Sequence, residues 1–326
     1  MFIVRAPLRV SLAGGGTDIP SFYRENMGEV LSFAINKYVY LAFHETFRPG
    51  IRLAYSQTEN ISSINQIKHP LFRNAFQYLG SKNNIEIGSF ADIPSEGTGL
   101  GSSSAFTVAL VKGLTLINGF DVTKHEIAEK ACHIEINLCQ DPIGKQDQFA
   151  SAYGGFNHFR FFPNESVTST PIKMQKSVQD CLLLFYMDMS RSASAILKLQ
   201  ATVMKAGTRQ FSNLNRILQQ VEFMKNSILL EDFEAVGALL HENWVLKREM
   251  TELTSNLEID ELYELALRNG ALGGKVLGAG GGGFMLLCVK SDRQQEFIDR
   301  FPLRHIPFEV DAKGVFEIPL SKKLGD

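Results

Sequence analysis

A glycine-rich segment at residues 94–105, PSEGTGLGSSSA, constrains the fold of this 326-residue chain more than any other feature. Gly97, Gly99 and Gly101 alternate along it, and three serines and an apolar helical pattern follow. Glycines let backbone N–H groups approach a ligand closely, and a helix N-terminus adds unpaired donors and a positive dipole end. The segment therefore predicts a cradle for a phosphate group. The simpler alternative is a glycine turn capped by serines, but a turn needs only one glycine.

The predicted cradle differs from that of P-loop nucleotide-binding proteins, because G-x-x-x-x-G-K-[ST] occurs nowhere in the chain. A net charge of −2 and the lack of any basic block argue against nucleic acid as a partner. Four cysteines without a C-x-x-C pair, a first segment interrupted by Arg5 and Arg9, and only short apolar runs are typical of a cytoplasmic protein without a membrane span. We therefore expect a small phosphate compound as the partner.

Hydrophobic patterning predicts a chain of mixed strands and helices. A capping box, Thr123 with Glu126, starts one helix that is expected to reach Leu138. Strands are expected at residues 2–12, 30–45, 85–90, 156–162, 167–173, 181–187, 284–289, 307–310 and 314–318. Helices are expected at residues 103–118, 123–138, 193–205, 211–227, 232–248, 260–269 and 294–300. We place a domain boundary just before the strand at 181–187, which divides the chain into residues 1–178 and 179–326.

Two carboxylates near the predicted cradle are candidates for chemistry. Glu135 lies at the edge of the apolar face of its helix, where a charge is costly unless it is paired or binds a cation. Alone it is best interpreted as a salt-bridge residue, but beside a phosphate loop a magnesium ligand becomes a comparable interpretation. Asp147, in the segment GKQDQ at 144–148, is alone best interpreted as part of a solvated helix start. Its functional interpretation is a carboxylate that orients or deprotonates a hydroxyl group.

A second glycine-rich segment spans Gly273–Gly283. Gly278, Gly280 and Gly283 match G-x-G-x-x-G, but a dinucleotide-binding fingerprint opens a helix, and here an apolar strand pattern follows. The glycines are interpreted as allowing close backbone packing against a ligand or another loop. A flexible hairpin is the weaker alternative, because flexible linkers usually carry polar residues too.

Three segments together resemble the motifs of the GHMP kinases, in the family's order and spacing: residues 5–18 (RAPLRVSLAGGGTD), the 94–105 segment and the 275–284 segment. The resemblance covers almost the whole chain. It implies an α+β fold of two domains, an N-terminal domain like domain 2 of ribosomal protein S5 and a ferredoxin-like C-terminal domain. It also implies an active site between the two domains that uses ATP and Mg²⁺.

The resemblance also implies roles for individual residues. Asp147 matches the catalytic aspartate, and Arg9 matches the basic residue that faces the acceptor oxygen. Ser103, with Ser102 as a close rival, and Glu135 match the magnesium ligands. The residues implied in binding the ATP phosphates are Pro94, Gly97, Thr98, Gly99, Leu100, Gly101, Ser102, Ser103 and Ser104.

Within the family, Gly-Gly-Gly-Thr-Asp at 14–18, with residues 35–40 and 144–148, is similar to bacterial D-glycero-D-manno-heptose 7-phosphate kinases. These enzymes phosphorylate the anomeric C1 hydroxyl, so a sugar phosphate and ATP are the implied partners. A kinase of L-fucose, galactose or another hexose, a silent sugar-binding relative and a diphosphomevalonate-type decarboxylase are the alternatives. The implied substrate-binding residues are Thr17, Asp18, Gly280 and Gly281, with Lys145 and Arg191 as candidate cations for the substrate phosphate.

Overall fold

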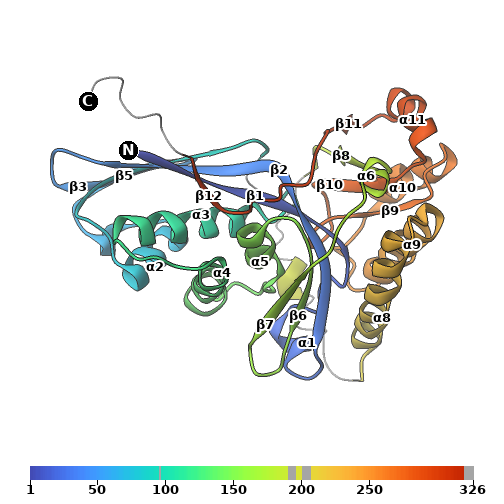
Figure 1. The fold of residues 1–326 in the computed structure, drawn as a ribbon, viewed down its shortest axis with the longest axis horizontal. Helices are drawn as coiled ribbons and strands as arrows, with labels where there is room; N and C mark the ends of the chain where they lie inside the picture. The colour runs from blue at the N-terminus through green and yellow to red at the C-terminus, as the bar shows by residue number, and fades with distance from the viewer. Residues whose placement is uncertain (95–96, 190–195, 200–206, 319–326) are drawn as a thin grey trace.

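The computed structural model describes residues 1–94, 97–189, 196–199 and 207–318, and two sheets organise them (Figure 1). The larger sheet has eight strands: β1 (Phe2–Ala13), β2 (Gly28–Glu45), β3 (Gly50–Ala54), β4 (Thr58–Ile61), β5 (Asn84–Ala91), β6 (Phe156–Phe161), β7 (Val167–Pro171) and β12 (Phe316–Ile318). The smaller sheet has four: β8 (Leu182–Tyr186), β9 (Gly273–Val276), β10 (Phe284–Cys288) and β11 (Arg304–His305).

The described α-helices are α1 (Pro20–Tyr23), α2 (Pro70–Leu79), α3 (Ser102–Ile117), α4 (Lys124–Cys132), α5 (Gln146–Tyr153), α6 (Lys176–Asp180), α8 (Arg209–Leu229), α9 (Phe233–Arg248), α10 (Leu257–Arg268) and α11 (Gln294–Arg300). A π-helix, His133–Leu138, continues α4, and short 3₁₀ turns lie at Ile64–Gln66 and Ser291–Arg293. Within the described ranges, no helix has the length and apolar character needed to cross a membrane.

The larger sheet runs in the order β12-β1-β2-β5-β3-β4, with β6 and β7 added beside β2. The 18-residue β2 pairs with two strands along the same edge: its first part pairs with β6 and its last part with β5. Helices α2 to α5 lie together on one side of this sheet (Figure 1). Residues such as Leu8 and Val10 of β1 are fully buried in the core. The sheet and its helices thus form a layered support for the loops that run into α3 and α5.

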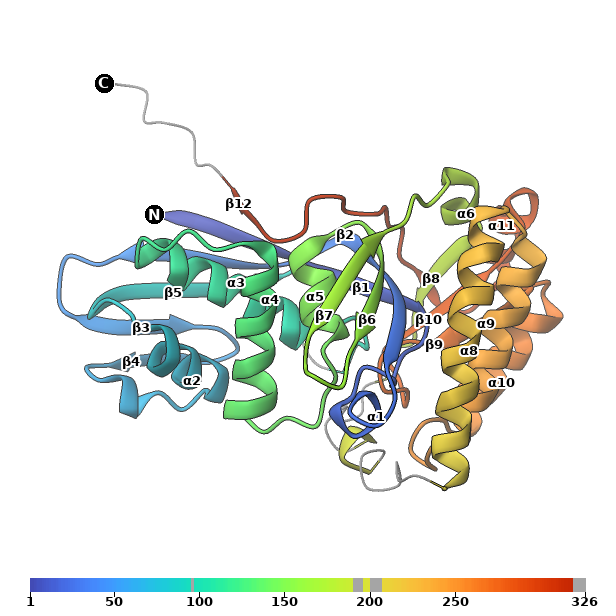
Figure 2. The same cartoon turned by 60° about the horizontal axis from the view of Figure 1, so that its bottom comes forward.

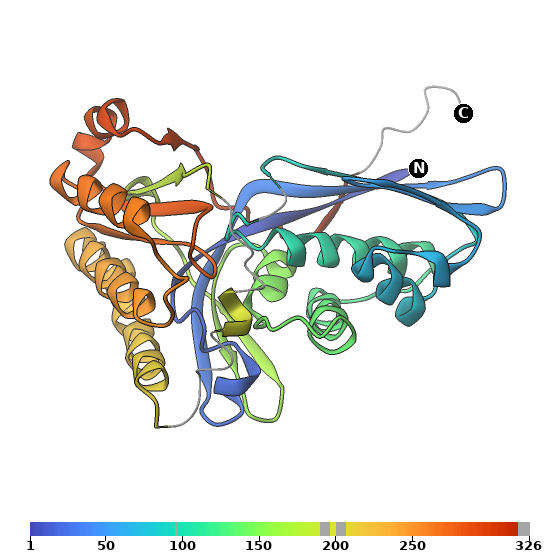
Figure 3. The same ribbon diagram turned by 180° about the vertical axis from the view of Figure 1, so that it is seen from behind.

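The smaller sheet is antiparallel in the order β11-β8-β10-β9. Helices α8, α9 and α10 stand side by side next to it (Figure 2). Val221 and Met224 of α8 and Leu240 of α9 belong to the same apolar cluster as the core of the larger sheet. The two halves therefore share a continuous core, and seen from behind they meet around β1, β2 and α5 (Figure 3).

Most predicted elements are confirmed, including the α+β mixture and the capping box of Thr123 and Glu126. The strand predicted at 307–310 is wrong: apart from one bridge at Val310, pairing in this region is limited to β11. The second glycine segment is not all loop, because β9 occupies its start. Much of the helix predicted at 193–205 lies outside the described residues. The boundary predicted at 178 falls within α6, and β12 returns to pair with β1, so the domain division stays a prediction.

Candidate active site

The predicted phosphate loop leads directly into α3. Gly97, Gly99 and Gly101 have φ angles of 67°, 72° and 76°, in the left-handed region that favours glycine. Gly101 is the N-cap of α3, and no side chain caps the helix and no acidic residue occupies its first turn. The first N–H groups of a 16-residue helix are therefore available to an anion. The Leu100 carbonyl accepts a hydrogen bond from the Arg9 amide at 3.0 Å, which anchors the loop on β1.

The second glycine loop packs against the first, backbone to backbone. A Cβ on Gly278 would lie 2.4 Å from Gly99 Cα, and a Cβ on Gly99 would lie 2.4 Å from the Leu277 carbonyl oxygen. A Cβ on Gly283 would likewise lie 2.4 Å from the carbonyl oxygen of Thr98. Side chains have no room at these positions, so the glycines are needed for the two loops to meet.

The serines of the first turn of α3 face different ways. Ser102 is buried, and its hydroxyl lies 3.0 Å from that of Thr98, within the loop. Ser103 is exposed, and its hydroxyl donates to Glu135 Oε1 at 2.9 Å. Of the two candidate metal ligands, this geometry favours Ser103, because its hydroxyl lies beside the acidic candidate.

Glu135 lies in the π-helix that follows α4, where a wider turn replaces the regular helical ladder. Such turns are frequent at functional sites. Its side chain is 0% exposed, and Gln148 donates to its Oε2 at 2.6 Å. Burial raises the pKa of Glu135 to about 7, while the hydrogen bonds from Gln148, Ser103 and Ser104 partly oppose this shift.

A magnesium ion fits the environment of Glu135. The described hydrogen-bond partners of its carboxylate, Ser103, Ser104 and Gln148, are all neutral, so its buried charge lacks a cation. No group of three or more acidic, histidine or cysteine side chains gathers for a metal among the described residues. Ser103 and Glu135 would therefore hold the ion together with phosphate oxygens of a nucleotide.

Asp147 and Arg9 form a two-pronged ion pair beside the phosphate loop. Arg9 Nε lies 2.7 Å from Asp147 Oδ1, and the second guanidinium nitrogen, NH2, lies 2.9 Å from Oδ2. NH1 of Arg9 donates to the Gly99 carbonyl at 2.5 Å. A Cβ on Gly101 would lie only 3.1 Å from Asp147 Oδ2. The carboxylate is thus next to the start of α3, and each of its oxygens retains a lone pair for a hydroxyl group.

Asp18 lies near Asp147, whose charge acts on it. Its buried carboxylate accepts hydrogen bonds from the Gly16 amide at 3.0 Å and from Gln146, through the backbone N–H at 3.1 Å and through Nε2 at 3.0 Å. Burial and the charge of Asp147 raise the pKa of Asp18 to about 6. Gly144 allows the approach, because a Cβ there would lie 1.9 Å from Asp18 Oδ2. Thr17 supports the turn by donating its hydroxyl to the Gly14 carbonyl at 2.8 Å.

The other predicted substrate contacts are less directly placed. Lys145 Nζ pairs with Glu165 Oε2 at 2.7 Å, so its charge is already engaged. Hydrogen bonds from Lys145, Tyr23 and Arg24 outweigh the effect of burial and lower the pKa of Glu165 to about 2. The amide of Gly281 donates to the Thr254 carbonyl at 2.8 Å, and a Cβ on Gly280 would lie 2.5 Å from the same oxygen. Arg191 lies outside the described residues. The roles of these residues stay predictions.

Sequence reasoning missed two lysines at this site. Lys247 of α9 donates to the carbonyls of Val276 and Gly278 in the second glycine loop. Lys275 is buried and donates to Asn243 Oδ1 at 2.7 Å. Burial, and then the charge of Arg9, lower the pKa of Lys247 to about 7, although Asp147 opposes the shift. Burial also lowers the pKa of Lys275 well below its ordinary value, as do the charges of Lys247 and Arg9.

A lysine on an apolar stripe was the available signal for Lys247. Trp244 and Leu240, one and two turns earlier on α9, are fully buried and share its face. A cation in register with such a stripe is costly unless it has a function or a partner, by the same reasoning that selected Glu135.

We expect Lys247→Met to change how the stability of the protein depends on pH. A folded-state pKa of about 7, below the ordinary 10.5, means that the folded protein releases this proton before the unfolded chain does. The free energy of unfolding of the wild-type protein therefore increases as pH rises from about 7 to about 10.5. Below pH 7 the folded protein carries the full cost of burying the charged ammonium group. Urea unfolding of Lys247→Met across this range should show a smaller gain than wild type, with the remainder due to Lys275, whereas the exposed-lysine control Lys176→Met should retain the full gain. Parallel curves for wild type and Lys247→Met would contradict the prediction.

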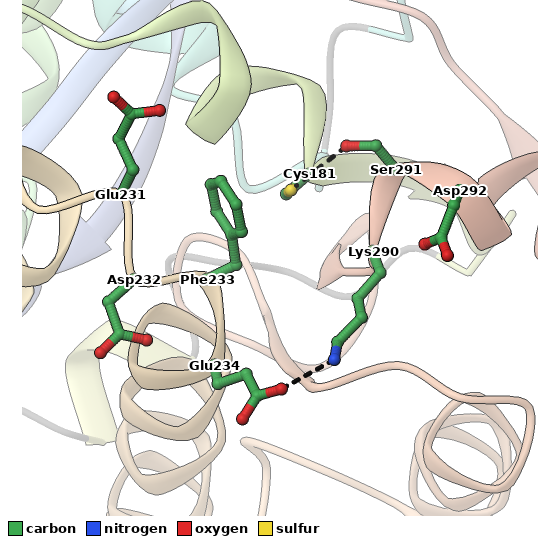
Figure 4. A pocket seen from close by; sticks show the side chains of 8 residues that line it. All are labelled: Cys181, Glu231, Asp232, Phe233, Glu234, Lys290, Ser291 and Asp292. Carbon is green, nitrogen blue, oxygen red and sulfur yellow. Dashed lines mark hydrogen bonds and ion pairs between the residues drawn. The ribbon is translucent and has the colours of Figure 1, made fainter.

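A separate cavity of about 490 Å³ lies between the start of α9 and the turn after β10 (Figure 4). Of its eight lining residues four are acidic, and Glu234 pairs with Lys290 at 2.7 Å. An acidic lining disfavours a phosphate compound, and its residues do not include the predicted site residues. The cavity is therefore distinct from the site around Asp147.

Comparisons with known proteins give two family matches. The model of the GHMP kinases N-terminal domain matches residues 65–155, and that of the GHMP kinases C-terminal region matches residues 223–304. Together the two models cover more than half of the chain. These matches lie on either side of the predicted boundary.

Two curated proteins and one solved structure illustrate what the chain is similar to. It is 28% identical over 310 residues to a D-glycero-alpha-D-manno-heptose 7-phosphate kinase of Campylobacter jejuni, covering 90% of this chain and 91% of that protein. It is 26% identical over 360 residues to a galactokinase of Thermotoga neapolitana, covering 97% and 99%. The crystal structure of a D-glycero-D-manno-heptose 1-phosphate kinase from Bacteroides thetaiotaomicron has the same fold, with a TM-score of 0.79 and 24% identity over 99% of this chain and 100% of that one.

Proposed function

The chain belongs to the GHMP kinase family and is a sugar kinase, and on this basis we propose that it phosphorylates the anomeric C1 hydroxyl of D-glycero-D-manno-heptose 7-phosphate to give the 1,7-bisphosphate. The observation that carries the proposal is the position of Asp147, paired with Arg9 and adjacent to Gly101 at the start of α3. A sugar hydroxyl bound to Asp147 would face a phosphate held by the loop.

In the proposed reaction, Asp147 orients the acceptor hydroxyl and accepts its proton as the new O–P bond forms and the bond from the phosphoryl group to ADP breaks. Arg9 fixes the carboxylate through two contacts, which is the orientation that a bidentate pair provides. Phosphoryl transfer depends mainly on positioning and on compensation of charge. The N–H groups of α3 and the Arg9 guanidinium would supply that compensation around the transferred group.

Ser103 and Glu135 hold the magnesium ion in this proposal. Bound by these residues, Mg²⁺ would offset the negative charge of the ATP phosphates. The buried carboxylate of Glu135 supplies the anionic ligand, and Gln148 keeps the side chain oriented through its 2.6 Å hydrogen bond. A silent sugar-binding relative would be expected to lack at least one of Ser103, Glu135 and Asp147. All three are present in this chain, which disfavours that alternative.

The heptose substrate is supported by the similarity to the Campylobacter enzyme and by the first motif. Two glycines, Gly15 and Gly16, precede Thr17-Asp18, where the galactokinase pattern has Glu-His. At Gly15 the missing side chain leaves space beside Ser11 and Gln146, near Asp18, for a larger acceptor. We further propose that the protein acts in the cytoplasm on free ATP and sugar phosphate.

A substrate panel tests the proposal. Purified protein with ATP and Mg²⁺ is assayed for ADP formation on D-glycero-D-manno-heptose 7-phosphate, L-fucose, galactose and mannose, and the product is examined for phosphate at C1. We expect the highest kcat/KM on the heptose phosphate. Turnover of an unphosphorylated hexose with none of the heptose phosphate would overturn the substrate assignment while leaving the sugar kinase activity intact.

A further inference from the structure

A small polar niche beside Asp18 has unsatisfied hydrogen-bonding groups that the proposed transfer does not use. It is formed by Ser11, Gln146 and the open side of Gly15, and we call it the Ser11 niche. The Ser11 side chain is 6% exposed, and neither its hydroxyl nor Oε1 of Gln146 has a partner among the described residues. Buried polar groups are nearly always hydrogen-bonded in folded proteins, so these two atoms indicate a ligand.

Strand geometry aims Ser11 into the site. Residues 8–11 of β1 pair in regular register with Ile35, Ala34, Phe33 and Ser32 of β2, and register shifts lie on both sides of this stretch. Because side chains alternate along a strand, Ser11 projects from the same face as Arg9, whereas Val10 faces the core. Irregularities of this kind are common next to active sites, where they aim a side chain.

Gly15 leaves the niche open for a reason other than backbone conformation. Gly14 and Gly16 have φ angles of 83° and 99°, but Gly15 is not among the residues with positive φ. A Cβ on Gly15 would lie 3.4 Å from Ser11 Oγ and 3.7 Å from Gln146 Nε2, which are ordinary contact distances. A side chain could therefore be accommodated by the protein itself, and its absence leaves space beside the Ser11 hydroxyl and the side-chain amide of Gln146.

The hydrogen-bonding pattern defines the ligand chemistry. Gln146 Nε2 is used in donating to Asp18 Oδ1 at 3.0 Å, which leaves Oε1 as an acceptor. The Asp18 carboxylate also accepts, and the Ser11 hydroxyl can donate or accept. A ligand that donates hydrogen bonds fits this arrangement, whereas a phosphate would meet two acceptors and a negative charge.

We propose that the Ser11 niche binds a hydroxyl group of the acceptor sugar next to the hydroxyl held by Asp18, and that it thereby sets which sugars are accepted. This inference rests on the proposed sugar kinase function. It places the phosphate of a phosphorylated substrate away from Asp18 and Gln146. Ser11 is a specificity-determining residue in this proposal, not a catalytic one, because the transferred phosphate lies at Asp147.

Binding of D-glycero-D-manno-heptose 7-phosphate, measured by calorimetry without ATP, tests the niche separately from turnover. Ser11→Ala should weaken the affinity for the sugar phosphate by about 5- to 10-fold, the loss expected for one hydrogen bond to a neutral group. In steady-state assays the KM of this variant for ATP should stay within about twofold of the wild-type value, because the substitution changes the sugar side of the site and leaves the phosphate loop unaltered. The matched control is Ser32→Ala. Ser32 lies opposite Ser11 on β2, and its own hydroxyl donates to the Val10 carbonyl.

Ring-deoxygenated analogues of the substrate identify the hydroxyl. One analogue, lacking the hydroxyl bound in the niche, should bind wild type and Ser11→Ala equally, while the others should keep the full difference. Equal losses with every analogue, or Ser11→Ala binding as tightly as wild type, would overturn the proposal. If the substrate panel shows a hexose kinase, that hexose and its deoxy forms replace the probe, so the niche is tested even when the heptose assignment fails. If no sugar binds, both proposals fail.

Gly15→Ala provides an independent variant that fills the space without removing a hydrogen-bonding group. We expect its melting temperature to stay close to that of wild type, because the backbone and the contact distances tolerate a methyl group. Its affinity for the sugar should fall about 10-fold or more, while ATP binding is unchanged. A Gly15→Ala variant with normal sugar affinity would show that no ligand atom occupies the niche.

Discussion

Asp147→Asn should lower kcat on the sugar substrate by about 10²- to 10⁴-fold, the contribution typical of general acid–base catalysis. The amide keeps the size of the side chain but cannot accept the hydroxyl proton. It also loses one of the two charge-assisted contacts with Arg9, which lie at 2.7 Å and 2.9 Å. The affinity for ATP should remain nearly intact, because the phosphate loop is held by Arg9 NH1 on the Gly99 carbonyl and by the Arg9 amide on Leu100.

Single-turnover kinetics and nucleotide binding, measured on the same preparations, check this expectation. Asp180→Asn, which changes an exposed aspartate on α6, is the matched control and should behave as wild type. Near-normal turnover of Asp147→Asn would remove Asp147 from the catalytic role. A loss of ATP affinity equal to the loss of turnover would instead indicate that the carboxylate mainly supports the loop.

Glu135→Gln should raise the Mg²⁺ concentration that gives half-maximal activity by about 10-fold or more, since a neutral amide is a far weaker ligand than a carboxylate. The folded protein should keep or gain thermal stability without Mg²⁺, because the carboxylate is buried without a cation among its described partners. Activity and stability would then change in opposite directions, which a general structural defect does not produce.

Magnesium titrations of initial rate and thermal melts, each with and without Mg²⁺, separate these effects. Glu129→Gln on α4, where the carboxylate is 53% exposed and pairs with His125, is the control on a neighbouring turn. An unchanged Mg²⁺ titration for Glu135→Gln would exclude the metal role of this residue.

Local chemistry allowed the phosphate loop and the helices beside it to be predicted from sequence. Alternate glycines followed by serines and an apolar period determine the loop and α3, and a capping box determines the start of α4. The missed helix α2 also carried local signals, because Pro70 occupies its first turn and Phe72 and Phe76 share its buried face.

Contacts between distant parts of the chain were beyond such reasoning. Arg9 and Asp147 are 138 residues apart, and only the packing of α5 on β1 brings them together. The π-helix displaces Glu135 from the regular helical projection, so a period of 3.6 residues describes its surroundings only approximately. Lys247 reaches the site from α9 through carbonyls of another loop, and the composition of either segment alone does not predict that contact.

The meeting of Gly99 with Gly278 has a consequence for the order in which the site matures during synthesis. N-terminal segments leave the ribosome first and can begin to fold before the rest of the chain exists. The phosphate loop would then lack its supporting backbone until residues 277–283 have been made, and β1 would lack its neighbour β12 until residue 318 has followed. A chain that has not yet reached residue 283 therefore has the nucleotide loop without the backbone that packs against it, and a complete site requires this later segment.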